Sequence, residues 1–473
     1  VLLSLATDEI SLSYWDYQLR LDGGTAKSGY TVFAFGASDE LEADSDPVTP
    51  GGQLESVFRM SFHRLELRYQ HTQGRLGGVY RLIGGYDDTM LGPDSGFSTL
   101  SVEPRFSWTW RFNEELELRS GLEGLAKDNS QKQAATEDQS GPPVEDVFGD
   151  QSRFYSFSAW LEGLWRPNPD WLIRPGIRTD VYNDRETTAP GLDPRLSARY
   201  RLPGLAMARA ATATLRDDEV PWIKGSVGLF HQPPRLFLTV PGFDTMPLRY
   251  GLLAALQLSV GVEYPLSHGF SIDAQTFYND MDPVIFDLSF NQAAEDFQQN
   301  ASSRMPNEAQ SDKDAAGGTV RESFDDLFLP QVGRAYGFEL LLRRKARSGA
   351  YGWLSYTLSL SEREREGEWV DFDYDRTHLL NLVAGVPLPR NWEFGARLQY
   401  QSGKPATTTY GYNSARTNGY MRIDIRFDKR AVWNHWLLDF YVDIGNVLLF
   451  PEEVAPGSVA KYFLPTVGFR GRL

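Results

Sequence analysis

The feature that most constrains the fold is a strict alternation of apolar and charged side chains, clearest in YMRIDIRFDKR at residues 420–430. Met421 and Ile423 alternate there with Arg422 and Asp424. Successive side chains of a β-strand point to opposite faces, so such a strand has one apolar face and one charged face. The chain is therefore predicted to be all-β, because the pattern recurs in WDYQLRLD (15–22), WEFGARLQYQ (392–401) and LLDFYVDIGN (437–446).

Composition excludes several classes of protein for a chain of 473 residues. No apolar run reaches the roughly 18 residues of a membrane-spanning helix, and the mean hydropathy of -0.39 is too low for a bundle of such helices. Cysteine is absent, which excludes disulfides, thiolate metal sites and cysteine nucleophiles. A formal net charge of -16 argues against nucleic acid as a partner, because phosphate binding needs a basic surface.

The connections between the predicted strands are of two kinds, short and long, which alternate along the chain. Tight turns are predicted at residues 113–115, 168–170, 267–269, 345–349 and 389–391. Long polar loops are predicted at residues 127–152, 232–253, 289–333, 404–417 and 449–461. Soluble β-sandwiches and propellers also have alternating strands, but their loops are short at both ends. Short turns at one rim and long loops at the other are typical of an outer-membrane barrel, so we expect a transmembrane antiparallel β-barrel with a wet lumen.

The number of predicted strands is about 19, whereas single-chain bacterial barrels have even numbers. The first predicted strand leads into a short turn at residues 23–29, and the last, at 462–473, follows a long loop. If both termini of a closed barrel lie in the periplasm, at least one more strand precedes residue 1. Residues 1–473 are therefore expected to form one barrel domain that is incomplete at its N-terminus.

Several stretches, taken in order, resemble the barrel of TonB-dependent outer-membrane receptors. They include GLFHQPPRLFL (228–238), GRAYGFELLLRR (333–344) and LLDFYVDIGNVLLFPE (437–452), and the resemblance covers nearly the whole chain. The family's barrel has about 22 strands and a plugged lumen, so the resemblance implies that roughly three strands and the plug domain are absent from this chain. It also implies a TonB-type motor as a partner, and a plug that comes from upstream sequence or from another chain.

Residues 203–222, PGLAMARAATATLRDDEVPW, are too long for the short turn expected at their place. The Ala-rich middle has apolar residues at helical spacing and could form a short periplasmic helix, or it could be two strand ends joined by a turn. A helix here would be a docking surface for a periplasmic partner.

The sequence contains no recognisable catalytic or metal site. The six histidines form no HxxxH or HExxH pair, and no GxSxG, Walker or GxGxxG motif is present. We therefore expect neither an enzyme nor a resident cofactor or metal. Outer-membrane lipid and lipopolysaccharide are the expected surroundings.

Two sets of residues are candidates for function. Aromatic side chains at the predicted outer rim could grip a ligand, or could pack among loops: Trp369, Tyr374, Tyr410 and Tyr412. A polar wall is predicted to line the lumen, where it would hold a plug through ion pairs or set ion selectivity in an open pore: Arg174, Arg178, Arg343, Arg397, Arg422, Asp424 and Arg426.

Three functions fit these features in the outer membrane of a Gram-negative bacterium. The first, which the resemblance implies, is uptake of a scarce nutrient ligand through a plugged lumen. The second is a passive pore without a plug. The third is an outer-membrane scaffold within a larger envelope complex. The substrate cannot be read from the loops.

Overall fold

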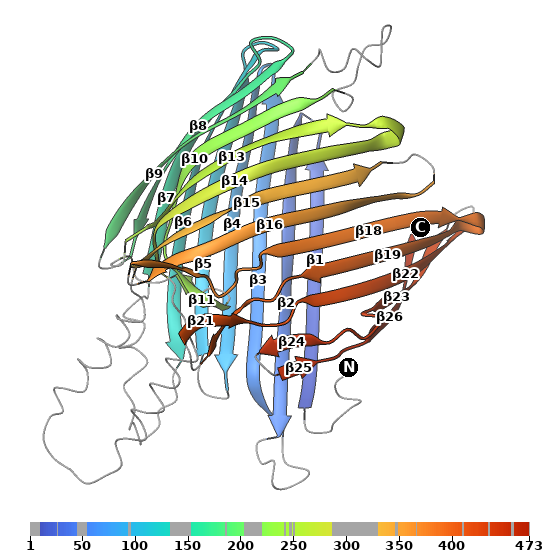
Figure 1. The fold of residues 1–473 in the computed structure, drawn as a ribbon. Helices are drawn as coiled ribbons and strands as arrows, with labels where there is room; N and C mark the ends of the chain where they lie inside the picture. The colour runs from blue at the N-terminus through green and yellow to red at the C-terminus, as the bar shows by residue number, and fades with distance from the viewer. Residues whose placement is uncertain are drawn as a thin grey trace, which may run out of the picture.

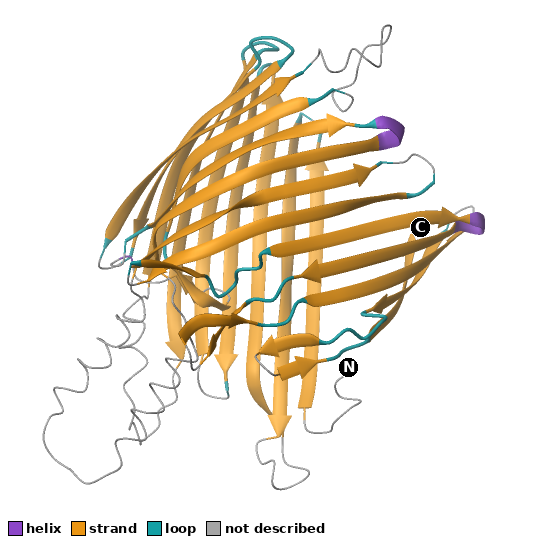
Figure 2. Cartoon of the chain, in the orientation of Figure 1, coloured by secondary structure: helices purple, strands orange, loops and turns teal. Residues whose placement is uncertain are grey.

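The computed structural model describes most of the chain: residues 10–25, 27–44, 54–92, 96–132, 153–184, 187–202, 220–240, 243–245, 248, 251–285, 330–345, 349–365, 367–408, 411–433, 436–455 and 458–472. Strands make up nearly all of this part (Figure 2). Two 3-10 turns, Ser267–Gly269 (η3) and Pro389–Asn391 (η4), lie entirely within the described residues. None of these residues belongs to a helix long and apolar enough to cross a membrane.

Twenty strands form one antiparallel sheet that curls on itself, so that β13 to β26 cross in front of β1 to β7 in Figure 1. The strands are β1 Ile10–Gly24, β2 Ser28–Asp44, β3 Leu54–Gln73, β4 Leu76–Leu91, β5 Gly96–Arg111, β6 Leu116–Lys132, β7 Arg153–Trp165, β8 Trp171–Asn183, β9 Thr188–Arg201, β10 Trp222–Gln232, β13 Leu253–Pro265, β14 Phe270–Ile285, β15 Pro330–Arg344, β16 Tyr351–Arg365, β17 Glu368–Asp371, β18 His378–Leu388, β19 Trp392–Gln401, β22 Tyr420–Val432, β23 Leu437–Gly445 and β26 Leu464–Arg472.

The short strand β17 is the outer continuation of β18. Both pair with β16, on the edge opposite to β15: Asp371 lies opposite Glu362, and His378 lies opposite Leu358. In the described part of the chain, the twenty strands therefore occupy nineteen positions across the sheet, which confirms the number expected from the alternation. Each strand pairs with its successor in the chain, as in an up-and-down barrel.

The two rims differ as the sequence predicted. The predicted tight turns, such as 113–115 and 389–391, join neighbouring strands at one rim, which we call the short-turn rim. The opposite rim, the long-loop rim, holds three added hairpins: β11 Arg235–Val240 with β12 Phe243–Thr245, β20 Pro405–Thr408 with β21 Gly411–Arg416, and β24 Glu452–Ala455 with β25 Ser458–Ala460. Three predicted long loops therefore contain short hairpins. The strands also reach further into two other predicted loops, because β6 extends to Lys132 and β15 begins at Pro330.

The predicted insertion at residues 203–222 lies at the short-turn rim, since β9 ends and β10 begins there with Arg201 opposite Trp222. Residues 203–219 themselves lie outside the described part of the chain, so the predicted helix stays a prediction.

The two faces of the sheet have opposite chemistry. On β22, Ile425 pairs with Ala396 and Ile444, whereas the next residue, Arg426, pairs with Gly395 and Asp443. The apolar face is widely exposed, and the charged face carries ion pairs such as that between Arg426 and Asp428. A sheet closed with this charged face inward would have an apolar outer surface and a hydrated, polar lumen.

Exposed aromatic rings gather on the apolar face near the short-turn rim. Tyr69, Tyr80 and Phe106 are aligned across β3, β4 and β5, and their ring centroids are 6.2 and 6.0 Å apart. Trp108 donates a hydrogen bond to the Tyr80 hydroxyl at 3.2 Å. Amphipathic rings at one level are typical of a membrane-interface girdle. Trp353, by contrast, lies on the polar face with Ser355, opposite Arg343.

The first and last strands of the sheet each have one paired edge in the described part of the chain. β1 pairs with β2 and β26 pairs with β23, and no pairing joins β1 to β26. Unpaired backbone N–H and C=O groups are costly in hydrocarbon, so these two edges need partners in a membrane.

Candidate functional site

Arginine side chains stack on aromatic rings at the long-loop rim, in three pairs. The Arg334 guanidinium lies 4.0 Å from the centroid of the Trp369 ring. Arg363 lies 3.9 Å from the centroid of Phe372. We call these four residues, with the pair of Arg365 and Tyr412 at 4.0 Å, the rim cluster. The hairpin of β16 and β17 folds the run SEREREGEWVDFDYDR (361–376) back on itself and places Trp369 opposite Glu364 and Val370 opposite Arg363. Arg334 and Trp369 are therefore on one face of the sheet, and Arg363 and Arg365 are on the other.

Arg363 is the most deeply buried member of the rim cluster, with 5% of its surface exposed. Its Nη1 donates a hydrogen bond to the Glu362 carbonyl oxygen at 2.9 Å. No carboxylate pairs with it among the described residues, so the Phe372 ring is its principal neighbour. A cation over an aromatic face is attracted by the ring quadrupole, and more strongly where water is excluded.

The hairpin of β20 and β21 is held against this region by Arg416. Its Nη2 atom lies 2.6 Å from Asp375 Oδ2 and 2.7 Å from Asp371 Oδ2. Asp375 is 2% exposed and also accepts a hydrogen bond from the backbone N–H of Ser361 at 2.7 Å. Burial by itself lowers the pKa of Arg416, but the hydrogen bonds and charges of the two aspartates outweigh it, so the pKa is raised.

A third aspartate completes the connection between the hairpin and residues 371–375. Asp373 accepts hydrogen bonds from the Tyr412 hydroxyl at 2.7 Å and from the Asn413 side chain at 2.8 Å. The clamp, as we call Arg416 with these three aspartates, joins two long-loop segments that are about 40 residues apart in the sequence.

Three of the four predicted rim aromatics are described, and all three lie in or beside these two groups. Trp369 and Tyr412 are engaged by arginines as given above, and Trp369 is 37% exposed. Tyr374 is 74% exposed and has its ring 5.5 Å from that of Phe372. Tyr410 lies outside the described residues.

The residues predicted to line the lumen all lie on the charged face, but they are not one cluster. Arg178 bridges Glu123 at 3.1 Å and Asp180 at 2.9 Å, and Asp180 is 2% exposed. Arg422 pairs with Asp424 at 2.6 Å, and Arg397 lies 4.0 Å from the same carboxylate. Positions on the same face are also occupied by Arg174, Arg343 and Arg426.

Sequence reasoning missed the arginines and aspartates of the rim. The signal was present, because Arg363 and Arg365, and likewise Asp371, Asp373 and Asp375, recur at every second position. Residues at that spacing share a face where the chain is extended. Arg416 could not have been found in this way, since its partners are distant in the sequence.

The described residues contain no group of three histidine, aspartate or glutamate side chains placed to hold a metal ion. His378, at the start of β18, forms a hydrogen bond between its Nδ1 and the Tyr356 hydroxyl at 2.9 Å. The rim and the wall thus carry charged groups, aromatic rings and hydrogen-bond donors.

Solved structures with the same fold are receptors and transporters. The ferripyoverdine receptor of the Pseudomonas aeruginosa outer membrane has a TM-score of 0.66 and 11% identity, over 98% of this chain and 65% of that one. The ferric-catecholate import receptor Fiu of E. coli K12 has a TM-score of 0.64 and 11% identity, over 98% of this chain and 74% of that one. The FrpB iron transporter of Neisseria meningitidis has a TM-score of 0.65 and 11% identity, over 97% of this chain and 72% of that one. This chain thus spans slightly less than two thirds of the first of these proteins.

No curated protein sequence matches the chain. A family model does: the TonB dependent receptor-like β-barrel matches residues 6–447, which is most of the 473 residues. The match agrees with the antiparallel sheet, the unequal rims and the similar receptor structures. The chain therefore belongs to the family of TonB-dependent receptor-like β-barrels, whose members are transporters and receptors rather than enzymes.

Proposed function

We propose that this chain forms the wall of an outer-membrane receptor that takes up a scarce nutrient ligand into a Gram-negative cell. The long-loop rim then faces the outside and the short-turn rim faces the periplasm. Family membership supports this placement, because TonB-dependent receptor barrels are outer-membrane proteins.

The lumen of the working receptor holds a plug domain, and a TonB-type motor acts on that plug. Ion pairs along the charged face support this part of the proposal. Arg426, for example, contacts both Asp428 and Asp443, and such pairs can be exchanged for contacts to a plug at small net cost in a wet lumen.

The proposed cargo is a ferric chelate. Ferripyoverdine and ferric catecholates are named as ligands of the similar receptors, whose low identity supports the fold alone. The observation that carries the proposal for this chain is the rim cluster, where three guanidinium groups lie 3.9–4.0 Å from aromatic ring centroids. Cations backed by rings present positive charge and flat apolar surface together, which suits an anionic chelate with aromatic arms.

Trp369, Tyr374, Tyr410 and Tyr412 are proposed to contact this ligand. Tyr374 offers the most open ring of the three that are described, whereas Trp369 and Tyr412 position the arginines beneath them.

The proposal is tested by binding of ferric catecholate and ferric hydroxamate chelates to the purified full-length protein, followed by the quenching of tryptophan fluorescence. Trp369→Ala is expected to weaken binding of the preferred chelate about tenfold or more, as loss of a central aromatic contact does. Trp353→Phe is the matched control, because Trp353 lies near the short-turn end of β16.

Uptake of radiolabelled iron by cells that carry these variants should follow the same order. Equal binding by wild type and Trp369→Ala, or no binding of any chelate in the panel, would contradict the proposed cargo. A steady open conductance in planar bilayers would contradict the plugged lumen and favour a passive pore.

A further inference from the structure

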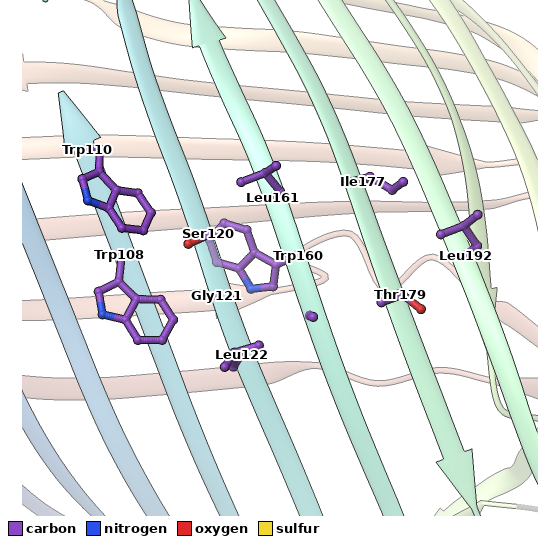
Figure 3. Close-up of a pocket in the computed structure, with 11 residues that line it drawn as sticks. Trp108, Trp110, Ser120, Gly121, Leu122, Trp160, Leu161, Ile177, Thr179 and Leu192 are labelled. Carbon is purple, nitrogen blue, oxygen red and sulfur yellow. The ribbon is translucent and has the colours of Figure 1, made fainter. Parts of the chain in front are cut away.

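A groove of about 560 Å³ crosses the apolar face of β5 to β9 (Figure 3). Its floor consists of small side chains from three neighbouring strands, Ser120, Ala159 and Thr179. Leu161 and Ile177 form its wall on the side of the short-turn rim. The groove has the volume of a small-molecule site, about 300–1,000 Å³, but it opens on the outer wall and not into the lumen.

The strand pairing shows which face the groove occupies. Ser120 lies opposite Leu161, which lies opposite Ile177, so these three share one face. The residues that follow the last two, Glu162 and Arg178, are on the charged face and make ion pairs. Leu161 and Ile177 are 43% and 45% exposed. The groove therefore lies on the face that meets hydrocarbon in a barrel of this family.

The height of the groove follows from its distance to the turns. Ser120 is four residues beyond the start of β6 at Leu116, and Ile177 is six residues beyond the start of β8 at Trp171. At a rise of about 3.3 Å per residue along strands tilted by about 40°, the groove begins roughly 10–15 Å from the short-turn rim. This is the periplasmic half of the hydrocarbon layer.

The ends of the groove suit a lipid rather than a free hydrophobic molecule. Trp108 and Trp110 line it at the end of β5 that leads to the short-turn rim, the level at which amphipathic rings meet lipid headgroups. Trp165 ends β7 on the same face with 46% exposure, and the next residue, Arg166, is exposed in the turn. A cation at this level complements the phosphate of a phospholipid.

The groove is closed to polar ligands. The hydroxyl of Thr179 already donates a hydrogen bond to the Gly191 carbonyl oxygen at 3.1 Å. The other named members of its floor and walls are apolar, apart from Ser120. We propose that the groove is a specific site for one acyl chain of a phospholipid from the periplasmic leaflet, held between the tryptophans and the walls formed by Leu161 and Ile177.

The test is retention of phosphatidylglycerol by the purified full-length protein in detergent, measured by native mass spectrometry across a range of lipid concentrations. Ala159→Phe fills the groove with an apolar ring, so it suits the lipid-facing surface and should still fold. The variant would displace about ten carbon contacts between the acyl chain and the groove, which is expected to lower the apparent affinity for phosphatidylglycerol about tenfold. Thr179→Leu is a second, independent filling variant, and heat-modifiable gel mobility confirms that each variant is folded.

Ala274→Phe is the matched control, because Ala274 lies on the apolar face of β14 opposite Val262 and Leu340, away from the groove. Wild type and this control should retain the same single lipid, and both groove variants should lose it. Equal retention by all four proteins would overturn the proposal. So would retention of lipopolysaccharide in place of phosphatidylglycerol, or a change from dimer to monomer on filling, which would assign the groove to a second copy of the chain.

Discussion

Removal of the guanidinium of Arg416 should release the β20–β21 hairpin from the rim while the barrel stays folded. Arg416→Met keeps the length and the apolar stem of the side chain but removes both ion pairs, to Asp371 and to Asp375. Asp375, with its side chain 1% exposed, would keep the Ser361 backbone N–H and the Thr377 hydroxyl as partners. A buried carboxylate would then have lost its only cationic partner among the described contacts.

The magnitude follows from the burial of the two partners. Loss of one partner of a fully buried ion pair costs about 3–5 kcal/mol. Because 32% of the Arg416 side chain is exposed, water screens part of this interaction, and we expect about 2 kcal/mol. This loss corresponds to a roughly 30-fold increase in the opening equilibrium of the hairpin.

The assay is hydrogen–deuterium exchange measured by mass spectrometry on peptides that cover residues 402–419, in the full-length protein in detergent micelles. The Arg416→Met variant should exchange roughly 30-fold faster there and at wild-type rates in β1 to β9. Arg20→Met is the control, because its pair with Asp22 is exposed on both sides and contributes little. Unchanged exchange of the hairpin, or faster exchange throughout the barrel, would refute the assignment of the clamp to Arg416.

Four further substitutions, one of them combined with a second-site change, test the two faces of the wall. Arg178→Met leaves the buried carboxylate of Asp180 without its arginine partner and should lower the free energy of unfolding in urea by about 3 kcal/mol. The double variant with Asp180→Asn should recover most of this loss, and no recovery would contradict the pairing. Ile425→Lys on the apolar face should cost about 2–4 kcal/mol in folding into lipid vesicles, whereas Thr357→Lys on the charged face should cost little. Equal costs would contradict this assignment of the two faces. Gly121→Ala places a Cβ 2.5 Å from the indole ring of Trp160, so it should lower the free energy of unfolding by about 1–3 kcal/mol and shift the tryptophan emission. An unshifted emission spectrum would contradict this packing.

The barrel-type fold was predictable because its signal is local. The side-chain period of two assigns each residue of β22 to a face from its immediate neighbours, and the tight turns at 113–115 and 389–391 need no distant partner. The number of strands followed by counting. The position of Trp353 on the polar face follows from the same rule, because Trp353 is two residues from Ser355.

The candidate site was predictable only in part. The predicted aromatics Trp369, Tyr374 and Tyr412 lie at the long-loop rim, where Trp369 stacks with Arg334, Tyr374 lies beside Phe372 and Tyr412 stacks with Arg365; their contact with a ligand stays a prediction. Their partners were not predicted, because a loop sequence does not encode the path of the loop.

The alternation of side chains along each strand was enough to indicate one greasy face and one charged face, since neighbouring residues on a strand must point in opposite directions. The alternation did not indicate contacts between segments that are distant in the sequence, such as the clamp at Arg416 and the groove floored by Ala159. Each depends on the register of one strand against the next and on the curvature of the whole sheet, and these arise from many weak interactions that act together.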